Sequence, residues 1–289
     1  FPTQDLVDQF LVTDEETGKA MPWYETSQYK NNVTVLDPSS ITEAGQVDAY
    51  KQVNGDARRI PTPQDLKQLN KSYPTFTRYH QLNKGADRDL SELMYSGRDR
   101  RFYTAIVYDK CSWIGETVEL NLGGNLSAGV RDKEDGGWYN TTTGYYWRKG
   151  NIENPTPRAY HNCQVALHFN IVRLGEAYMN LAEAYLLKHD VPNAVKALNM
   201  TRTIHGGLSE STAATEEEAW TDYIRERNCE LTNEGGDIYY SYLRWGKYGG
   251  YANHGRDAGD IIYDLDRPVY KMSISRDRSK LLVGQMTLN

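Results

Sequence analysis

The sequence lacks several features that would assign it to a common functional class. None of its apolar runs approaches the roughly 18 residues of a membrane-spanning helix. Its formal net charge of -6 provides no basic face for nucleic acid. The motifs Gly-x-Ser-x-Gly, Gly-x-x-x-x-Gly-Lys-Ser/Thr and His-Glu-x-x-His are all missing. We therefore expect a globular protein that does not bind nucleic acid, and these motifs give no support to an enzyme.

Cysteine is scarce, and histidine does not cluster. Cys111, Cys163 and Cys229 are far apart, and neither a Cys-x-x-Cys pair nor a nearby histidine gives the spacing of a metal site. We predict buried free thiols, with a single disulfide as the alternative. No metal or other cofactor is expected. A glycoside hydrolase stays open at this point, because it needs only two carboxylates across a cleft, and acidic residues such as Asp135 and Glu153 are available.

Two helical patterns follow residue 170. Apolar residues recur at alternating steps of four and three and predict a helix whose packing face is formed by Ile171, Leu174, Tyr178, Leu181 and Tyr185. Asp190 offers the N-cap of the next helix, which Gly206-Gly207 ends. This hairpin of about 34 residues is typical of a tetratricopeptide unit, and such units are stable only when roughly three or more stack. Because no second copy is found, we expect the neighbours to lie outside this sequence.

A third helix is predicted to begin at Thr215. Thr215 and Glu218 form a capping box, and Trp220, Ile224 and Leu231 follow at helical spacing. The polar face of this helix carries Arg225, Glu226, Arg227, Glu230 and Glu234. We interpret these charges as a solvated or internally ion-paired face, and catalytic carboxylates are the less favoured alternative.

The first half of the chain shows fewer helical signals. Residues 101–108 are rich in β-branched and aromatic side chains and predict a strand, with residues 118–122 as its partner in a small hairpin. Residues 123–157 combine glycine, asparagine, threonine and proline without a helical period, which indicates a long irregular loop. The predicted fold is therefore mainly α, a tetratricopeptide-like helical repeat scaffold with long irregular loops and a small β-hairpin element.

Aromatic residues gather in the segments predicted to be loops. The chain has 22 tyrosines, 6 tryptophans and 5 phenylalanines, so most of its rings combine a flat apolar face with a polar group. A sugar ring stacks its C–H face on such a ring, while its hydroxyls need polar partners. Packing of each ring into the core is the alternative. The predicted ligand-binding residues are Trp138, Tyr139, Asn140, Tyr145, Tyr146, Trp147 and Arg148 in the long loop, with Trp23, Tyr24 and Trp113 nearer the start.

Short motifs in a fixed order spread over nearly the whole chain. They are Pro2–Phe10, Gly97–Tyr103, Arg173–Ala184, Asn199 with Arg202, Glu226–Gly235, Arg244-Trp245 and Ile274–Arg278. Together they resemble the C-terminal half of SusD/RagB-type proteins, which are surface lipoproteins of the Bacteroidetes outer membrane. One departure is that Gly236, Asp237 and Tyr239-Tyr240 stand where the family usually carries an arginine and an aspartate before the final Arg-Trp.

The resemblance implies both an architecture and a function. Residues 1–289 would form the C-terminal part of one SusD/RagB-like domain, loop-rich and ligand-facing over about 1–165 and helical over about 166–289. The protein would capture an oligosaccharide or polysaccharide and deliver it to a SusC-like TonB-dependent outer-membrane transporter. Because such proteins bind their substrate and do not cleave it, the resemblance implies that this protein is not an enzyme and disfavours a glycoside hydrolase. It would be surface-exposed on the outer membrane, anchored through a lipidated N-terminal cysteine absent from this sequence. Two alternatives stay open, a peptide-binding uptake component of the same family and a tetratricopeptide scaffold that binds another protein.

Overall fold

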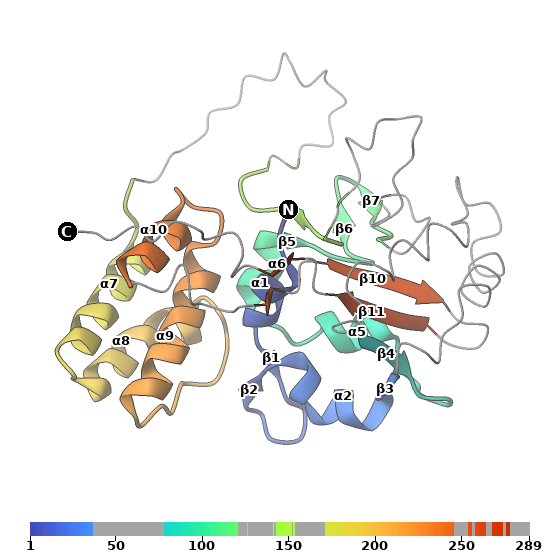
Figure 1. Ribbon diagram of the computed structural model, residues 1–289, viewed down its shortest axis with the longest axis horizontal. Helices are drawn as coiled ribbons and strands as arrows, with labels where there is room; N and C mark the ends of the chain where they lie inside the picture. Colours follow the sequence, from blue (N-terminus) through green and yellow to red (C-terminus); the bar gives the residue numbers. More distant parts are fainter. Residues whose placement is uncertain are drawn as a thin grey trace, which may run out of the picture.

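The computed structural model describes residues 1–36, 78–120, 126, 141, 143–151, 153 and 171–245, and the strands between residues 254 and 277 (Figure 1). This part of the chain forms a bundle of helices, a four-stranded antiparallel sheet with short helices beside it, and several pairs of two-residue strands. In Figure 1 the bundle and the sheet lie at opposite sides of the molecule, with α1 (Gln4–Gln9) and α6 (Arg100–Ala105) between them.

The helical bundle consists of α7 (Leu174–Leu187), α8 (Val191–Ile204), α9 (Glu216–Leu231) and α10 (Asp237–Arg244). Helices α7 and α8 form the predicted hairpin, and α9 packs against both. The Asp190 side chain accepts a hydrogen bond from the backbone N–H of Asn193, and Thr215 and Glu218 form the expected capping box. Helix α8 ends just before Gly207, whose φ of 66° suits glycine. The prediction of a mainly helical, tetratricopeptide-like scaffold is confirmed.

The buried face of α7 differs from the predicted one. Met179 and Leu186 are fully buried in the bundle, whereas Ile171, Leu174 and Leu181 are 86%, 70% and 44% exposed. The prediction was wrong because α7 is apolar on more than one side, and periodicity alone does not decide which side packs. An exposed apolar stripe therefore runs along a second side of α7.

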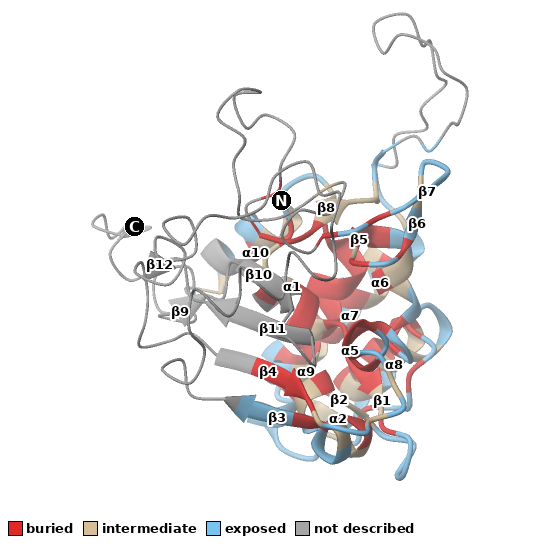
Figure 2. Ribbon diagram, turned by 90° about the vertical axis from the view of Figure 1, so that its right-hand side faces the viewer, coloured by how far each residue is buried: buried red, intermediate tan, exposed pale blue. Residues whose placement is uncertain are grey.

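A four-stranded sheet joins the two ends of the chain, and the sequence did not reveal it. Its order is β10 (Ala258–Tyr263), β11 (Pro268–Ser273), β4 (Arg78–Leu82), β3 (Val33–Leu36). His80 lies opposite Tyr270 on one side and Val35 on the other. Strand β4 is buried at His80, and the edge strand β3 is exposed at Val35 (Figure 2). Long-range pairing of this kind leaves no local signal in the sequence.

Short elements surround this sheet. Helices α1, α2 and α5 are each capped by the side chain of the preceding residue. The 3-10 helix η1 lies between β2 and α2, and two of the strand pairs are β1–β2 and β9–β12. The bounds are α1 (Gln4–Gln9), β1 (Val12–Thr13), β2 (Ala20–Met21), η1 (Trp23–Glu25), α2 (Ser27–Asn32), α5 (Leu90–Tyr95), β9 (His254–Gly255) and β12 (Arg276–Asp277).

The strand predicted over residues 101–108 is mostly helix. Helix α6 (Arg100–Ala105) begins after Asp99, whose carboxylate accepts a hydrogen bond from the Arg101 N–H at 2.9 Å. Only β5 (Ile106–Val107) is extended, and it pairs with β8 (Tyr146–Trp147) rather than with residues 118–122. A small hairpin is present nearby, between β6 (Ser112–Trp113) and β7 (Glu116–Thr117). The helix cap at Asp99 decides the local structure, despite side chains that favour a strand.

Helix α9 takes part in two hydrophobic cores. Tyr223 and Ile224 pack with α7 and α8 in the core of the bundle. Cys229, at the other end of α9, belongs to the larger core that includes Phe10 and Phe102. Cys229 and Cys111 are buried free thiols, as predicted, and Cys163 lies outside the described residues. Among the helices described, none has the length and apolar character needed to cross a bilayer.

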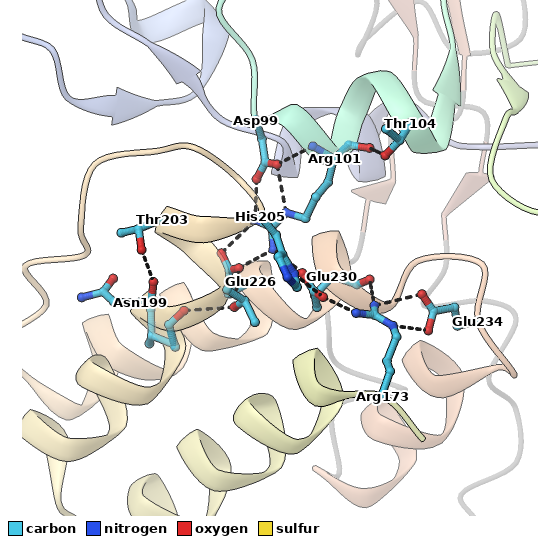
Figure 3. A network of polar contacts seen from close by, with 12 residues as sticks. Asp99, Arg101, Thr104, Arg173, Asn199, Thr203, His205, Glu226, Glu230 and Glu234 are labelled. Carbon is cyan, nitrogen blue, oxygen red and sulfur yellow. Dashed lines mark hydrogen bonds and ion pairs between the residues drawn. The ribbon is translucent and has the colours of Figure 1, made fainter. Parts of the chain in front are cut away.

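A buried cluster of charges joins α6 to α9 (Figure 3). Arg101 donates to Asp99 at 2.5 Å and to Glu230 at 2.9 Å, and it also forms an ion pair with Glu226. Thr201 of α8 donates to Glu226 at 2.8 Å. All three carboxylates are almost completely buried. We refer to Asp99, Arg101, Glu226 and Glu230 as the Arg101 cluster. The charged face predicted on this helix is therefore ion-paired internally rather than solvated.

Further charges extend the Arg101 cluster toward the start of α7. Arg173 forms an ion pair with Glu230 and donates to Glu234 at 2.8 Å (Figure 3). Lys149 also forms an ion pair with Glu234. His205, just after α8, lies 2.9 Å from Glu230 through Nδ1. The network thus holds three helices of the bundle against α6 and against the segment that follows β8.

Glu230 makes this network sensitive to acid. Burial disfavours its charged form, but hydrogen bonds from Arg173 and Arg101 outweigh burial and lower the pKa of Glu230 to about 2. A carboxyl whose pKa is lower in the folded state stabilises the fold above its unfolded pKa, and that contribution is lost as the pH falls toward the folded value. We expect the free energy of unfolding to fall between pH 4.5 and pH 2.

Urea unfolding at a series of pH values measures this effect. Glu230→Gln should be less stable than the wild type at pH 6 and should show a shallower loss of stability on acidification. Glu25→Gln, which changes an exposed carboxyl, should keep the wild-type pH dependence. A Glu230→Gln protein that loses stability with acid as steeply as the wild type would contradict the assignment.

Candidate ligand-binding site

An aromatic cluster lies where β8 passes the β6–β7 hairpin. The rings of Trp113 and Tyr146 stack with their centroids 5.8 Å apart and an interplanar angle of 27°. The exposed ring of Phe1 meets Tyr146 edge-on at 5.5 Å. In Figure 2 the N-terminus lies beside β8, the strand that carries Tyr146. We refer to Phe1, Trp113 and Tyr146 as the aromatic cluster. Two of its members were predicted from the sequence, and Phe1 was missed because its contact is purely tertiary.

Local structure explains why the two stacked rings meet. Ser112 and Trp113 pair with residues 116–117 across a tight turn in which Ile114 and Gly115 both have positive φ. Tyr146 is fixed by the pairing of β8 with β5, and its hydroxyl accepts a hydrogen bond from the Thr141 backbone N–H at 3.0 Å. Both rings are only partly buried. The pair is therefore held in place while part of its surface stays accessible.

Arg148 ties the two strand pairs together. It donates to the carbonyl oxygen of Ser112 at 2.9 Å and to that of Tyr103 at 3.3 Å. Glu153 binds the same guanidinium at 2.5 and 2.9 Å, and these hydrogen bonds are the main reason that the pKa of Arg148 is raised. Four of the five N–H donors of a guanidinium are thus occupied. Arg148 mainly positions the aromatic cluster, and its fifth donor has no partner among the described residues.

The indole nitrogen of Trp113 has an unusual environment. Trp113 packs against a small core that contains Val107, Cys111, Val118 and Leu120. Its Nε1 is buried and has no hydrogen-bond partner in the described part of the chain. Buried donors are nearly always paired, and an unpaired one costs about 1–3 kcal/mol. Within the described part of the chain, this enclosed donor lacks an acceptor.

Two of the predicted ligand-binding residues belong to the hydrophobic core instead. Trp23 is 0% exposed, and its indole N–H donates to Asp8 at 2.9 Å. Tyr145 is also 0% exposed, and its hydroxyl donates to Gln4 at 2.8 Å. A fully enclosed ring offers no face to a ligand. We therefore correct the prediction for Trp23 and Tyr145, for which the packing alternative holds.

The remaining predicted residues are either partly buried or outside the described part of the chain. Trp147 is partly buried against the larger core, and Tyr24 is partly exposed and meets Trp23 edge-on at 5.8 Å. Trp138, Tyr139 and Asn140 lie outside the described residues, as does Asp135. The structure thus brings Trp113, Tyr146 and Arg148 together and leaves the role of Trp138, Tyr139 and Asn140 as a prediction.

Metal-binding groups and the carboxylate considered for catalysis can be assessed among the described residues. No group of three or more histidine, cysteine or acidic residues in this part of the chain is placed to hold a metal ion. Glu153, a carboxylate considered for catalysis, forms an ion pair with Arg148. The chemical capacity of the aromatic cluster is therefore stacking and hydrogen bonding.

Comparisons with known proteins agree with this architecture. The family model described as "SusD family" matches residues 1–281. A solved SusD-like protein from Bacteroides fragilis NCTC 9343 shares 21% identity with a TM-score of 0.57, over 96% of this chain and 41% of that one. A SusD-like carbohydrate binding protein from the same organism shares 19% identity with a TM-score of 0.45, over 61% of this chain and 34% of that one.

Two further facts complete these comparisons. Curated proteins give no match to the chain. The chain spans about two fifths of the length of the first of the two solved structures, and that likeness concerns the fold. The family model, in contrast, covers nearly all residues from the first to the last helix and strand. This chain belongs to the SusD family.

Proposed function

We propose that this chain is part of a cell-surface glycan-binding protein that captures oligosaccharide and delivers it to a SusC-like TonB-dependent outer-membrane transporter. Membership of the SusD family supports a role in glycan binding and nutrient uptake. The single observation that carries the proposal is the stacked pair of Trp113 and Tyr146 beside the exposed Phe1. The function is binding without covalent change to the ligand.

The aromatic cluster suits a sugar in both its apolar and its polar parts. Neighbouring rings that lie nearly parallel give a flat surface on which the C–H face of a pyranose stacks. The remaining donor of Arg148 then binds a sugar hydroxyl. Water competes for every hydroxyl, so we expect modest affinity for each sugar unit. The proposal retains Trp138, Tyr139 and Asn140 as further contacts.

The proposal also includes a cellular location. We propose that it is exposed on the outer membrane and anchored by lipid on an N-terminal cysteine that these 289 residues do not contain. Residues 1–289 would be the C-terminal part of one SusD-like domain, so a further portion of the protein would complete the binding surface. The acceptor of the captured glycan would be the transporter.

Substitution of the stacked pair tests glycan binding. We expect Trp113→Ala and Tyr146→Ala each to weaken binding of a recognised oligosaccharide about tenfold, because each removes one stacking face worth about 1.4 kcal/mol. Isothermal titration against a panel of plant, host and microbial glycans gives the dissociation constants. Tyr240→Ala removes an exposed ring elsewhere and serves as the matched control. Unchanged affinity in both cluster variants would contradict the proposal.

A peptide ligand is the second candidate, and the edge strand β3 favours it. Val35 is exposed on this strand, and an exposed edge allows an extended peptide to add a further strand. The same titrations with a peptide mixture separate the candidates, since a peptide component binds peptides and no glycan. A tetratricopeptide scaffold for another protein predicts no change in tryptophan fluorescence with any saccharide.

A further inference from the structure

An open pocket of about 740 Å³ lies in the helical bundle, between α7, α9 and α10. Its volume is within the range of about 300–1,000 Å³ that small-molecule sites occupy. This pocket shares no lining residue with the aromatic cluster, and in Figure 1 helices α7, α9 and α10 lie apart from β6. Residues that line it include Glu183 and Leu187 from α7, Trp220 and Thr221 from α9, and Arg244 and Trp245 at the end of α10.

The inner wall of this pocket is rigid and fully paired. Glu183 accepts hydrogen bonds from Tyr223 at 2.6 Å, Arg244 at 2.7 Å and the Trp245 indole at 2.9 Å. The rings of Trp220 and Trp245 meet edge to face, with centroids 6.5 Å apart. Both indoles are therefore held in defined orientations before any ligand arrives.

The rim of the pocket keeps polar groups of both signs. Glu217, one turn before Trp220 on α9, contributes an exposed carboxylate. Arg244 is exposed beyond its contact with Glu183. The indole N–H of Trp220 is bonded to Glu216, so this side chain offers its ring rather than a donor. The exposed Leu187 adds apolar surface.

We propose that this pocket binds one pyranose unit of a glycan, with its C–H face on Trp220 and its hydroxyls on Glu217 and Arg244. An aromatic face beside one acceptor and one donor complements a neutral ring that carries hydroxyls. A charged group of either sign would be attracted by one of these two side chains and repelled by the other, whereas neutral hydroxyls pair with both. The proposal rests on the proposed function only in that the ligand is a glycan.

A second saccharide pocket has a consequence for long glycans. Two sites on one protein hold a polymer more tightly than either site alone, because the second contact is intramolecular. A glycan long enough to reach both sites should lose affinity when either site is damaged. A short fragment that fills only one site should respond only to substitutions in that site.

Fluorine NMR of protein labelled with 5-fluorotryptophan tests the pocket directly. The six tryptophans give separate probes, assigned by single Trp→Phe variants. When a recognised oligosaccharide is added, we expect the Trp220 signal to shift, and to shift also in the Trp113→Ala protein. Glu217→Gln is an exposed substitution that should not disturb folding. It should raise the dissociation constant obtained from the Trp220 signal about tenfold and leave the dissociation constant obtained from the Trp113 signal unchanged.

The outcomes separate this pocket from the proposed function. Shifts at Trp113 but not at Trp220 overturn the pocket and leave the proposed function standing. Shifts at Trp220 that persist without any response at Trp113 support the pocket and contradict the aromatic cluster as the capture site. A Trp220 response to a lysine-rich peptide but to no saccharide overturns the pocket as a sugar site, as does a Trp220 response that Glu217→Gln leaves unchanged.

Discussion

Replacing Arg101 with alanine is expected to destabilise the protein by about 3–5 kcal/mol. Arg101 is the shared partner of Asp99, Glu226 and Glu230, and all three carboxylates are almost completely buried. Without the guanidinium they repel one another in a region that water does not reach. Burial already raises the pKa of Glu226, and the loss of Arg101 should raise it further. Urea unfolding followed by circular dichroism gives the change in free energy.

A surface arginine provides the control for Arg101. Arg88 also binds two carboxylates, those of Glu15 and Glu92, but all three side chains are partly open to solvent. Exposed ion pairs contribute only about 0–1 kcal/mol, so Arg88→Ala should be nearly neutral. An equal loss of unfolding free energy in Arg101→Ala and Arg88→Ala would contradict the view that burial strengthens the contribution of the Arg101 cluster to stability.

Replacing Arg98 with alanine is expected to cost a similar amount, about 3–5 kcal/mol, for a different reason. The buried guanidinium of Arg98 donates to three backbone carbonyls, those of Met94 at 2.6 Å, Val7 at 2.7 Å and Phe10 at 2.8 Å. Each carbonyl left without a partner costs about 1–3 kcal/mol, and the vacated volume adds to the loss. The guanidinium also lies 5.0 Å from the centre of the Phe102 ring.

Arg98 holds α1 to the segment before α6, so its loss should destabilise the start of the chain. Hydrogen exchange should show faster exchange of the amides in residues 4–12 in Arg98→Ala than in the wild type. Arg100→Ala removes an exposed arginine two residues away and should leave both stability and exchange unchanged. Wild-type protection of residues 4–12 in Arg98→Ala would contradict this role.

The sequence predicted those features that depend on neighbours in the chain. The caps at Asp190 and Thr215 involve residues within three or four positions, so the pattern that stabilises each helix end is visible in the sequence. The same kind of signal was present at Asp99, where a helix begins. It was outweighed by the β-branched and aromatic residues of 101–108, and a strand was predicted wrongly.

Other features depend on contacts between distant residues and were not predictable in this way. The sheet pairs β4 with β11, and the aromatic cluster brings Phe1, Trp113 and Tyr146 together. The pocket beside Trp220 was also missed, because three helices supply its walls. Trp23 and Tyr145 show the reverse error. Composition identified rings able to bind a sugar but did not distinguish those enclosed by the core.

The position of α9 in two hydrophobic cores determines how this part of the chain should unfold. One end of the helix packs with α7 and α8, and Cys229 near its other end packs with Phe10 and Phe102. Loss of α9 would therefore open both cores together, and the Arg101 cluster spans the boundary between them. The bundle and the larger core should unfold as one cooperative unit, so that a destabilising substitution in either core lowers the temperature of a single shared transition.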